Sequence, residues 1–170
     1  MDSGASGGGA RMARGVTYVS AHFTIGEFAC QDANRTPYPH EWRETRLVKL
    51  CTTLETIRAE LNARQGRPVK LVITSGYRTP AHNASLSPPG AKASQHLEGQ
   101  AADIIAYRLL PDGSARSPRD WRKLHALTVG RVVADLMRTQ RILPGGVGHY
   151  KSFTHGDVRG WRTTFGSHRP

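Results

Sequence analysis

The sequence is poor in cysteine and has no long apolar run. Its 170 residues contain two cysteines, Cys30 and Cys51, which are too few for a disulfide framework and lack the spacing of a zinc finger. No apolar stretch approaches the roughly 18–20 residues that a membrane span requires. We therefore expect no transmembrane segment, and a chain of this length fits one domain that can bury its own hydrophobic core.

Acidic residues are also scarce. The chain has 13 Asp and Glu against 24 Lys and Arg, a formal net charge of +11. Such a charge favours anionic partners, which include nucleic acid, an anionic membrane face and an acidic cell-wall polymer. No nucleic-acid recognition motif and no basic strand interleaved with aromatics is present, so the sequence does not predict a specific nucleic-acid partner.

The first 15 residues are rich in Gly, Ser and Ala and lack the apolar centre of about 7–15 residues that a signal peptide has. We expect residues 1–20 to form a flexible leader and residues 21–170 to form one domain. Without a Sec-type signal, the chain is expected to start in the cytoplasm. Lysis, as in phage release, or another non-classical route would then deliver it to a cell wall.

Apolar residues recur at spacings of three and four between positions 47 and 61, which predicts a helix from Trp42 to about Arg64. Gly66 and Pro68 are expected to end this helix. The β-branched run VKLVIT at 69–74 predicts a buried strand, and residues 100–107 predict a second one. A short helix is expected near 81–84, and two short strands near 147–150 and 153–158.

A second long helix is predicted by a capping pattern. Ser117 is followed by Pro118 at the first helical position and by Asp120 three residues on, as in a capping box. The helix is expected to run to about Arg138. Helices would then pack on a small antiparallel sheet, which is an α+β arrangement.

Candidate catalytic and metal-binding side chains are most concentrated in residues 94–103, SQHLEGQAAD. A turn at Gly99 can bring His96 and Asp103 of this segment to one point. A second cluster is FTHGD at 153–157. Residues two apart in a strand face the same side, so His155 and Asp157 are expected to project together. His96, Asp103 and His155 would supply three zinc ligands and leave a fourth position for water, which is the form of a catalytic zinc site.

The pattern formed by Ser94, His96, Gly99, Ala101 and Asp103 resembles the signature of the zinc D-Ala-D-Ala peptidases, a family related in fold to the Hedgehog signalling domain. Three further regions are similar to that family's carboxypeptidase branch. They are FTIGEFAC at 23–30, SGYRTPAHN at 75–83, and the closing segments GVGHY at 146–150 and FTHGDVR at 153–159. The motifs occur in the family's order and cover roughly residues 22–162.

This resemblance implies a zinc ion held by His96, Asp103 and His155, and cleavage of a peptide bond in the peptidoglycan stem next to a D-amino acid. Arg78 is expected to act in the active site by offering a bidentate fork to a substrate carboxylate. Its alternative is a structural pair with an acidic neighbour. Ser94 would bind substrate or orient His96, unless it is a turn hydroxyl, and Tyr77 is also expected at the substrate.

The general base is where this sequence departs from the family. The best-known members have an acidic residue three positions before the last ligand His, and here that position is Ser152. Asp157 is the first choice for the catalytic base, with an alternative in which it orients a ligand His or pairs with Arg78. Glu98 is a further carboxylate near the expected metal. His149 is another catalytic candidate, able to accept a proton or to stabilise the oxyanion.

Two function classes follow. The first is a monomeric zinc metallopeptidase, a carboxypeptidase or an endopeptidase such as an endolysin, that acts on peptidoglycan. The second is a non-catalytic, zinc-containing binding module that anchors to a wall or virion on the same fold. Ser152 at the usual base position favours the second class, and the full set of motifs favours the first.

Overall fold

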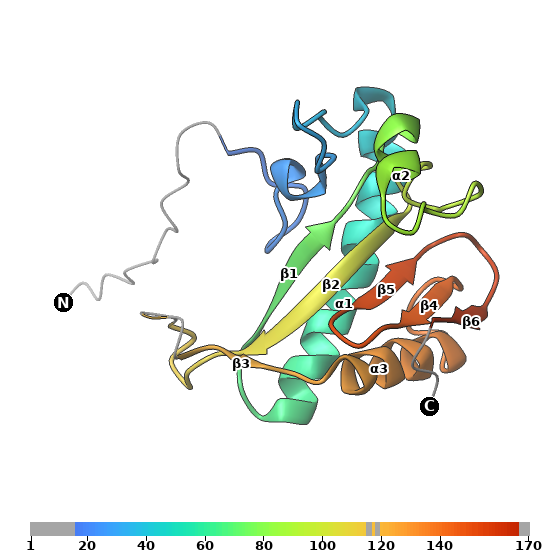
Figure 1. The fold of residues 1–170 in the computed structure, drawn as a ribbon. Helices are drawn as coiled ribbons and strands as arrows, with labels where there is room; N and C mark the ends of the chain where they lie inside the picture. The colour runs from blue at the N-terminus through green and yellow to red at the C-terminus, as the bar shows by residue number, and fades with distance from the viewer. Residues whose placement is uncertain (1–15, 115–116, 118–119, 167–170) are drawn as a thin grey trace.

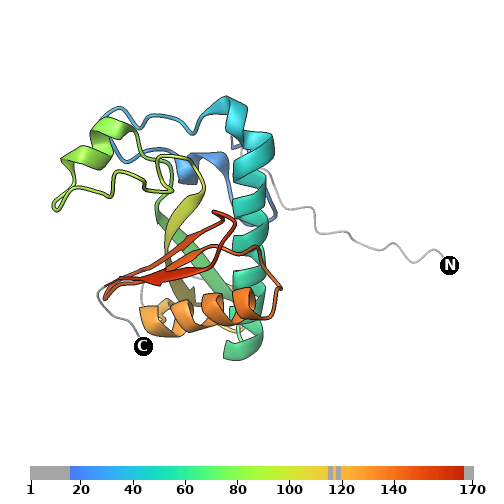
Figure 2. The ribbon, with the colours of Figure 1, turned by 90° about the vertical axis from the view of Figure 1, so that its right-hand side faces the viewer.

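The computed structural model describes residues 16–114, 117 and 120–166, and in this part of the chain it confirms the predicted α+β class. A six-stranded sheet carries both long helices, α1 and α3, on the same face (Figures 1 and 2). The helices are α1 (Val48–Gln65), α2 (Pro80–Ser85) and α3 (Ala126–Arg138). The strands are β1 (Val69–Ser75), β2 (Ala101–Arg108), β3 (Arg122–Lys123), β4 (Gly146–His149), β5 (Thr154–Asp157) and β6 (Thr163–Phe165).

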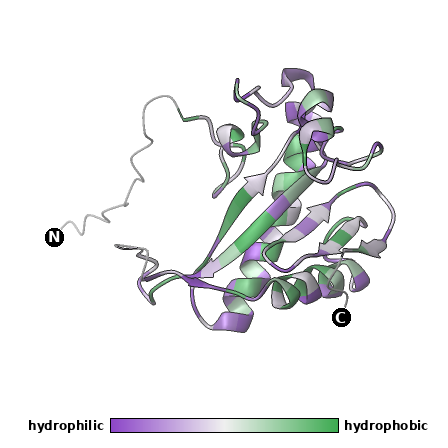
Figure 3. Ribbon diagram, viewed as in Figure 1, coloured by the Kyte–Doolittle hydropathy of each residue, from purple (hydrophilic) through white to green (hydrophobic). Residues whose placement is uncertain are grey.

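The strand order in the sheet is β1-β2-β5-β4-β6, and β3 pairs with the end of β2. All neighbours are antiparallel except β4 and β6, which run parallel. The parallel pair and β6 itself are absent from the sequence-based prediction. Figure 3 shows hydrophobic residues along β1 and β2, the two longest strands of the sheet. Helix α1 packs on β1 and β2, whereas α3 packs chiefly on β4 and β5.

The predicted apolar stripe of the first helix is confirmed, because Leu47, Leu50, Leu54, Ile57 and Leu61 are all buried. The regular α-helix begins at Val48 rather than Trp42, since a 3-10 turn at His40–Trp42 and a π turn at Arg43–Leu47 precede it. Gly66 ends the helix in the left-handed conformation, with φ of 58°. Residues with a Cβ atom are strained in this conformation, so a glycine at this position is a reliable sequence signal for the end of the helix.

The predicted start of the second long helix is wrong. Helix α3 begins at Ala126, and the His125 side chain caps it by accepting a hydrogen bond from the Leu127 amide. The Ser117 amide does donate to Asp120 Oδ2 at 2.8 Å, but the strand Arg122–Lys123 follows this contact and a helix does not. Pro118 lies outside the described residues. The chain between Asp120 and α3 stays extended because it pairs with β2. Arg122–Lys123 form the strand pair, and the Leu124 amide donates to the Ala106 carbonyl.

The N-terminal segment lies against the domain from residue 16 onward, and residues 1–15 of the expected leader fall outside the described residues. Tyr18 forms a β-bridge with Thr24, and the Ile25 amide donates to the Thr17 carbonyl at 2.9 Å. Val19 packs against the hydrophobic core. In the described part of the chain, no helix is long and apolar enough to cross a membrane.

Helix α3 approaches β4 closely at Gly130. A Cβ atom at this position would lie 2.3 Å from His149 Nδ1, so Gly130→Ala requires the helix or the buried imidazole to move. We expect it to lower the free energy of unfolding by about 1–3 kcal/mol, despite the roughly 0.5–1 kcal/mol that alanine contributes to a helix. Urea denaturation would measure the change. Gly26→Ala is the control, since a Cβ there meets nothing within 4 Å, and an equal loss in both variants would contradict the packing argument.

Candidate metal centre and cleft

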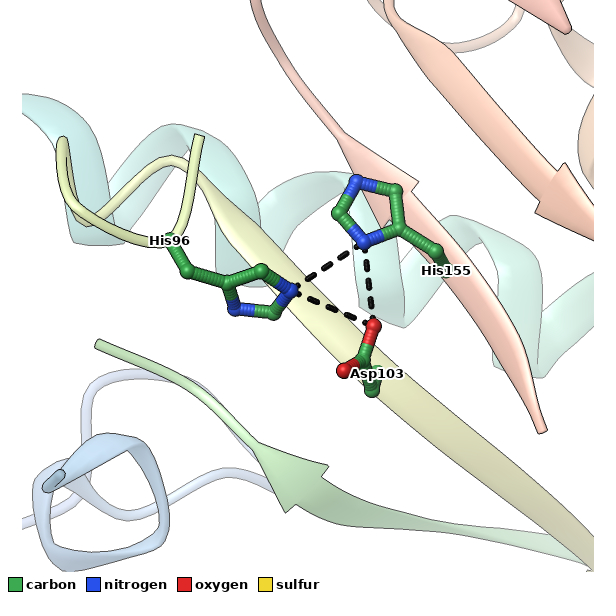
Figure 4. A group of neighbouring side chains, drawn as sticks. All are labelled: His96, Asp103 and His155. Carbon is green, nitrogen blue, oxygen red and sulfur yellow. Dashed lines mark hydrogen bonds and ion pairs between the residues drawn. The ribbon is translucent and has the colours of Figure 1, made fainter. Parts of the chain in front are cut away.

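His96, Asp103 and His155 meet at one point, as the sequence predicts (Figure 4). Asp103 on β2 stands directly opposite His155 on β5 in the antiparallel register, while His96 lies in the loop that precedes β2. His96 Nε2 is 3.2 Å from Asp103 Oδ1 and 3.1 Å from His155 Nδ1, and His155 Nδ1 is 3.0 Å from the same Asp103 oxygen. Three side chains from distant parts of the sequence therefore present one ligand atom each.

Strand alternation places this group on the face of the sheet opposite the helices. Ala102 and Ile104 belong to the hydrophobic core, so Asp103 between them points to the other face. Gly148, directly opposite His155 on β4, leaves room for the imidazole: a Cβ there would lie 2.9 Å from His155 Cβ. All three side chains of the group are buried, and burial without partners would penalise their charges.

The hydrogen bond made by Nδ1 of His96 determines which nitrogen of the ring carries the hydrogen. His96 Nδ1 is 2.6 Å from the Gly76 carbonyl oxygen, which can only accept a hydrogen bond. Nδ1 therefore carries the hydrogen, and Nε2 directs a lone pair toward Asp103 and His155. Burial lowers the pKa of His96 more than Asp103 raises it, so the ring favours the neutral form that a metal requires.

His155 is oriented by Asp157 in the same way. His155 Nε2 is 3.0 Å from Asp157 Oδ2, so Nε2 donates and Nδ1 faces Asp103 and His96. Burial lowers the pKa of His155, but the hydrogen bonds to Asp103 and Asp157 outweigh it, and the net pKa is raised. For Asp103 burial raises the pKa of the carboxyl, but the adjoining imidazoles of His155 and His96 outweigh this effect and bring the net pKa well below its usual range.

This donor set fits a divalent cation. Two imidazole lone pairs and one carboxylate oxygen converge, and only a proton or a cation can satisfy all three. Ligand atoms at about 2.0–2.2 Å from zinc are about 3.3–3.6 Å apart in a tetrahedral site, close to the 3.0–3.2 Å observed here. The second nitrogen of each histidine is held by an acceptor, which is the usual support of ligating histidines.

The turn after β1 supports the metal group through backbone hydrogen bonds. The Arg78 amide donates to the His96 carbonyl at 3.0 Å, and the Tyr77 amide donates to the Phe28 carbonyl at 2.9 Å. Gly76 is essential to this contact, because a Cβ at that position would lie 2.6 Å from Phe28 Cα. The backbone of the N-terminal segment thus supports the carbonyl that orients His96.

The Arg78 guanidinium forms the pair with an acidic neighbour that was the alternative to substrate binding, and it also lines a cleft. Its Nη2 donates to Asp103 Oδ2 at 2.6 Å, and its Nε donates to the Ser75 hydroxyl at 2.9 Å. The same side chain lines a cleft of about 650 Å³ beside the metal group. Ser94 also lines this cleft, and its hydroxyl accepts a long hydrogen bond from the His96 amide at 3.4 Å.

One wall of the cleft is the proline-rich loop 86–91, which Asn83 holds in place. The Asn83 side-chain amide donates to the Ala91 carbonyl at 3.2 Å, and its backbone carbonyl accepts from the Gly90 amide at 2.9 Å. Thr79 caps the short helix α2 that carries Asn83. The SGYRTPAHN segment therefore positions both Arg78 and a wall of the cleft. A second groove, between α1 and residues 140–144, contains none of these residues.

Asp157 was the first choice for the catalytic base, but its contacts are those of a residue that orients a ligand histidine. Besides His155, it accepts hydrogen bonds from the Gly146 amide at 2.8 Å and from Arg159 Nε at 2.8 Å. It is buried behind His155 and does not line the cleft. Burial raises the pKa of the Asp157 carboxyl, and its bonds to His155 and Arg159 bring the net pKa far below the usual range, so it stays a carboxylate.

The structure brings neither His149 nor Glu98 into the cleft. His149 neighbours Gly148 on β4 and points to the opposite face, where it packs against Gly130 of α3. Glu98 is half exposed and pairs with Arg46 Nη1 at 2.9 Å. Ser152 is exposed on the β4–β5 turn. Among the described residues, Asp103 is the one carboxylate that lines the cleft.

Tyr77 also lies apart from the cleft, in edge contact with Tyr38 and Trp42. The side chains that line it and that sequence reasoning missed include Tyr150, Phe153, Arg159 and Phe165. Tyr150 and Phe153 stack with ring centroids 4.5 Å apart, and Phe165 lies 5.2 Å from the His155 ring. Arg159 could have been found from its spacing, since it follows Asp157 by two residues and pairs with it.

A family model described as Peptidase M15 matches residues 21–114, more than half of the chain. The matched region contains Arg78, His96 and Asp103, and the structure adds His155 from beyond it. A comparison with curated proteins found no match. Together with the fold, the family match shows that the chain belongs to peptidase family M15, the zinc D-Ala-D-Ala carboxypeptidase family of metallopeptidases.

Proposed function

We propose that this protein is a zinc peptidase that hydrolyses a peptide bond of the peptidoglycan stem next to a D-amino acid, and that it acts at the cell wall. The observation that carries the proposal is the convergence of His96, Asp103 and His155 beside a cleft with two arginines. In this proposal the three side chains hold the zinc. When bound, zinc lowers the pKa of a water molecule and polarises the scissile carbonyl.

Arg78 and Arg159 support an anionic peptide as the substrate. Both guanidinium groups line the cleft, and both are anchored by a carboxylate, Asp103 and Asp157 respectively. An arginine held in one orientation offers a preorganised fork to a substrate carboxylate, with little loss of side-chain entropy. The stem peptide carries such carboxylates. The Tyr150 hydroxyl and Ser94 add neutral hydrogen-bonding groups to the same cleft.

Asp157 is proposed to orient His155 rather than to act as the base. Its oxygens contact His155, Arg159 and the Gly146 amide, so it holds the ring and fixes which nitrogen carries the hydrogen. This arrangement keeps His155 Nδ1 directed at the other two ligands. Outer-shell carboxylates of this kind raise the basicity of a ligating histidine.

The proposal is tested by incubating the purified protein with peptidoglycan and identifying released fragments by mass spectrometry. We expect new stem-peptide ends, and we expect a chelator to abolish their release and added zinc to restore it. Chelation should also lower the melting temperature by roughly 5–10 °C, since a ligand at 100 times its Kd stabilises by about 2.7 kcal/mol. The fragment masses distinguish a carboxypeptidase, which releases a terminal residue, from an endopeptidase.

The second candidate function is favoured by Ser152 and by the lack of a further described carboxylate in the cleft. A non-catalytic module on this fold would bind zinc in a 1:1 ratio and bind the wall. Zinc at that ratio without any cleaved stem peptide would support the module and contradict the peptidase. A metal-free protein that nonetheless cleaves the stem would contradict the zinc assignment itself.

A further inference from the structure

Three arginines line a further pocket at the far end of the sheet. Arg67, Arg108 and Arg122 line a cavity of about 410 Å³ together with Leu109, Leu110 and Asp120. Arg67 lies between α1 and β1, Arg108 ends β2, and Arg122 begins β3. Figure 1 shows β3 at the opposite end of β2 from α2 and the metal side of the molecule. The pocket is therefore separate from the cleft described above.

Two of these arginines stand directly opposite each other. Arg108 pairs with Arg122 in the antiparallel register of β2 and β3, which places their Cβ atoms about 4.5–5.5 Å apart. Like charges in this position destabilise a sheet. Arg67 adds a third positive charge to the same cavity. A bound anion would offset this repulsion.

Half of the arginines in the described part of the chain have a carboxylate within ion-pair distance, and these three do not. In the described part of the chain, no carboxylate lies within 4.0 Å of the guanidinium nitrogens of Arg67, Arg108 or Arg122. Asp120 lines the pocket, but its Oδ2 accepts from the Ser117 amide. Arginines with a carboxylate partner are Arg46, Arg58, Arg64, Arg78, Arg138, Arg141 and Arg159.

We propose that the pocket of Arg67, Arg108 and Arg122 binds a phosphate group of a phosphodiester-linked polyol, the chemistry of an anionic wall polymer. Arginine forks match phosphate oxygens. The described lining has no aromatic ring on which a nucleobase could stack, and Asp120 can accept a hydrogen bond from a polyol hydroxyl. The choice of a wall polymer rests on the proposed function, whereas phosphate binding does not.

The position of the pocket makes it an anchor rather than a part of the cleft. Arg108 follows Asp103 by five residues on β2, which corresponds to about 17 Å along the strand. An odd separation also puts the two side chains on opposite faces of the sheet. A polymer held here would raise the local concentration of the attached peptidoglycan without contacting the scissile bond.

The test is direct binding of a short poly(glycerol phosphate), measured by calorimetry at two salt concentrations. We expect Arg108→Gln/Arg122→Gln to weaken binding at least tenfold, and Arg131→Gln/Arg162→Gln to leave it nearly unchanged. The control removes the same charge from exposed sites elsewhere. The polymer should also raise the melting temperature of the native protein but not that of the first double variant, whose own stability should not fall because it loses a like-charge pair.

Other results would overturn the proposal. Equal weakening in both double variants would indicate a diffuse effect of net charge, and equal affinity for single-stranded DNA with the same number of phosphates would indicate a general polyanion site. A failure of the peptidase assay leaves this binding test unaffected, so the two proposals fail separately. If both hold, the Arg108→Gln/Arg122→Gln variant should cleave polymer-bearing walls more slowly and a soluble stem peptide at the normal rate.

Discussion

Replacing His96 with alanine is expected to remove the metal and to lower peptidase activity by at least about 1000-fold, because the metal supplies several kcal/mol of transition-state stabilisation. The side chain provides one of three converging ligand atoms, and its Nδ1 bond to the Gly76 carbonyl shows that Nε2 is free to ligate. With two ligands left, Asp103 and His155 form an incomplete site.

Zinc content by atomic absorption and turnover on a stem peptide would measure the effect of His96→Ala. His40→Ala is the matched control, since His40 is exposed and lies outside the metal group. Circular dichroism establishes that both variants fold. A folded His96→Ala protein that keeps stoichiometric zinc would show that the three residues are not the ligand set.

Asp157→Asn is expected to weaken zinc binding by about 10–100-fold, the usual effect of losing an outer-shell partner, while most of the kcat returns at saturating zinc. The substitution removes the charge that holds Arg159 and replaces an acceptor beside His155 Nε2. If Asp157 were the base, the loss in kcat would be about 100- to 10000-fold and would persist at any zinc concentration.

The measurement for Asp157→Asn is activity as a function of free zinc, which separates metal affinity from turnover. Asp135→Asn is the control because Asp135 is also paired with arginine but is half exposed on α3, outside the metal group. Its zinc dependence should match that of the native protein. A kcat of Asp157→Asn that stays more than 100-fold low at saturating zinc would restore Asp157 as the base and contradict the orienting role.

Two residues of the metal group, His96 and Asp103, were predictable because their signal is local. The small residues between them allow a turn that brings His96 and Asp103 together, whereas His155 contacts them only in the observed strand register and was assigned with the help of the family resemblance. The first helix was equally accessible, since a run of apolar residues at helical spacing ends at a glycine that takes the left-handed conformation. In both cases the physical cause lies within one continuous segment of the chain.

The roles of Asp157 and His149 were not predictable in this way, because they depend on which strand lies beside β5. Alternation alone places Asp157 on the same face as His155, but only the Gly146 amide and Arg159 show that its oxygens are already engaged. His149 faces α3 because Gly148 takes the place opposite His155. The predicted start of α3 was wrong for a related reason. The capping contact between Ser117 and Asp120 does form, but the residues after it pair with β2 instead of continuing as a helix.

The support of His96 by the Gly76 carbonyl and the Phe28 backbone has a consequence for folding. The orientation of one ligand depends on segments at positions 28, 76 and 96, which are far apart in the chain. A short peptide that carries the SQHLEGQAAD motif would hold two ligand types but not their geometry. Metal affinity in this protein is therefore a property of the assembled domain, and zinc binding during refolding would report the final docking of the N-terminal segment.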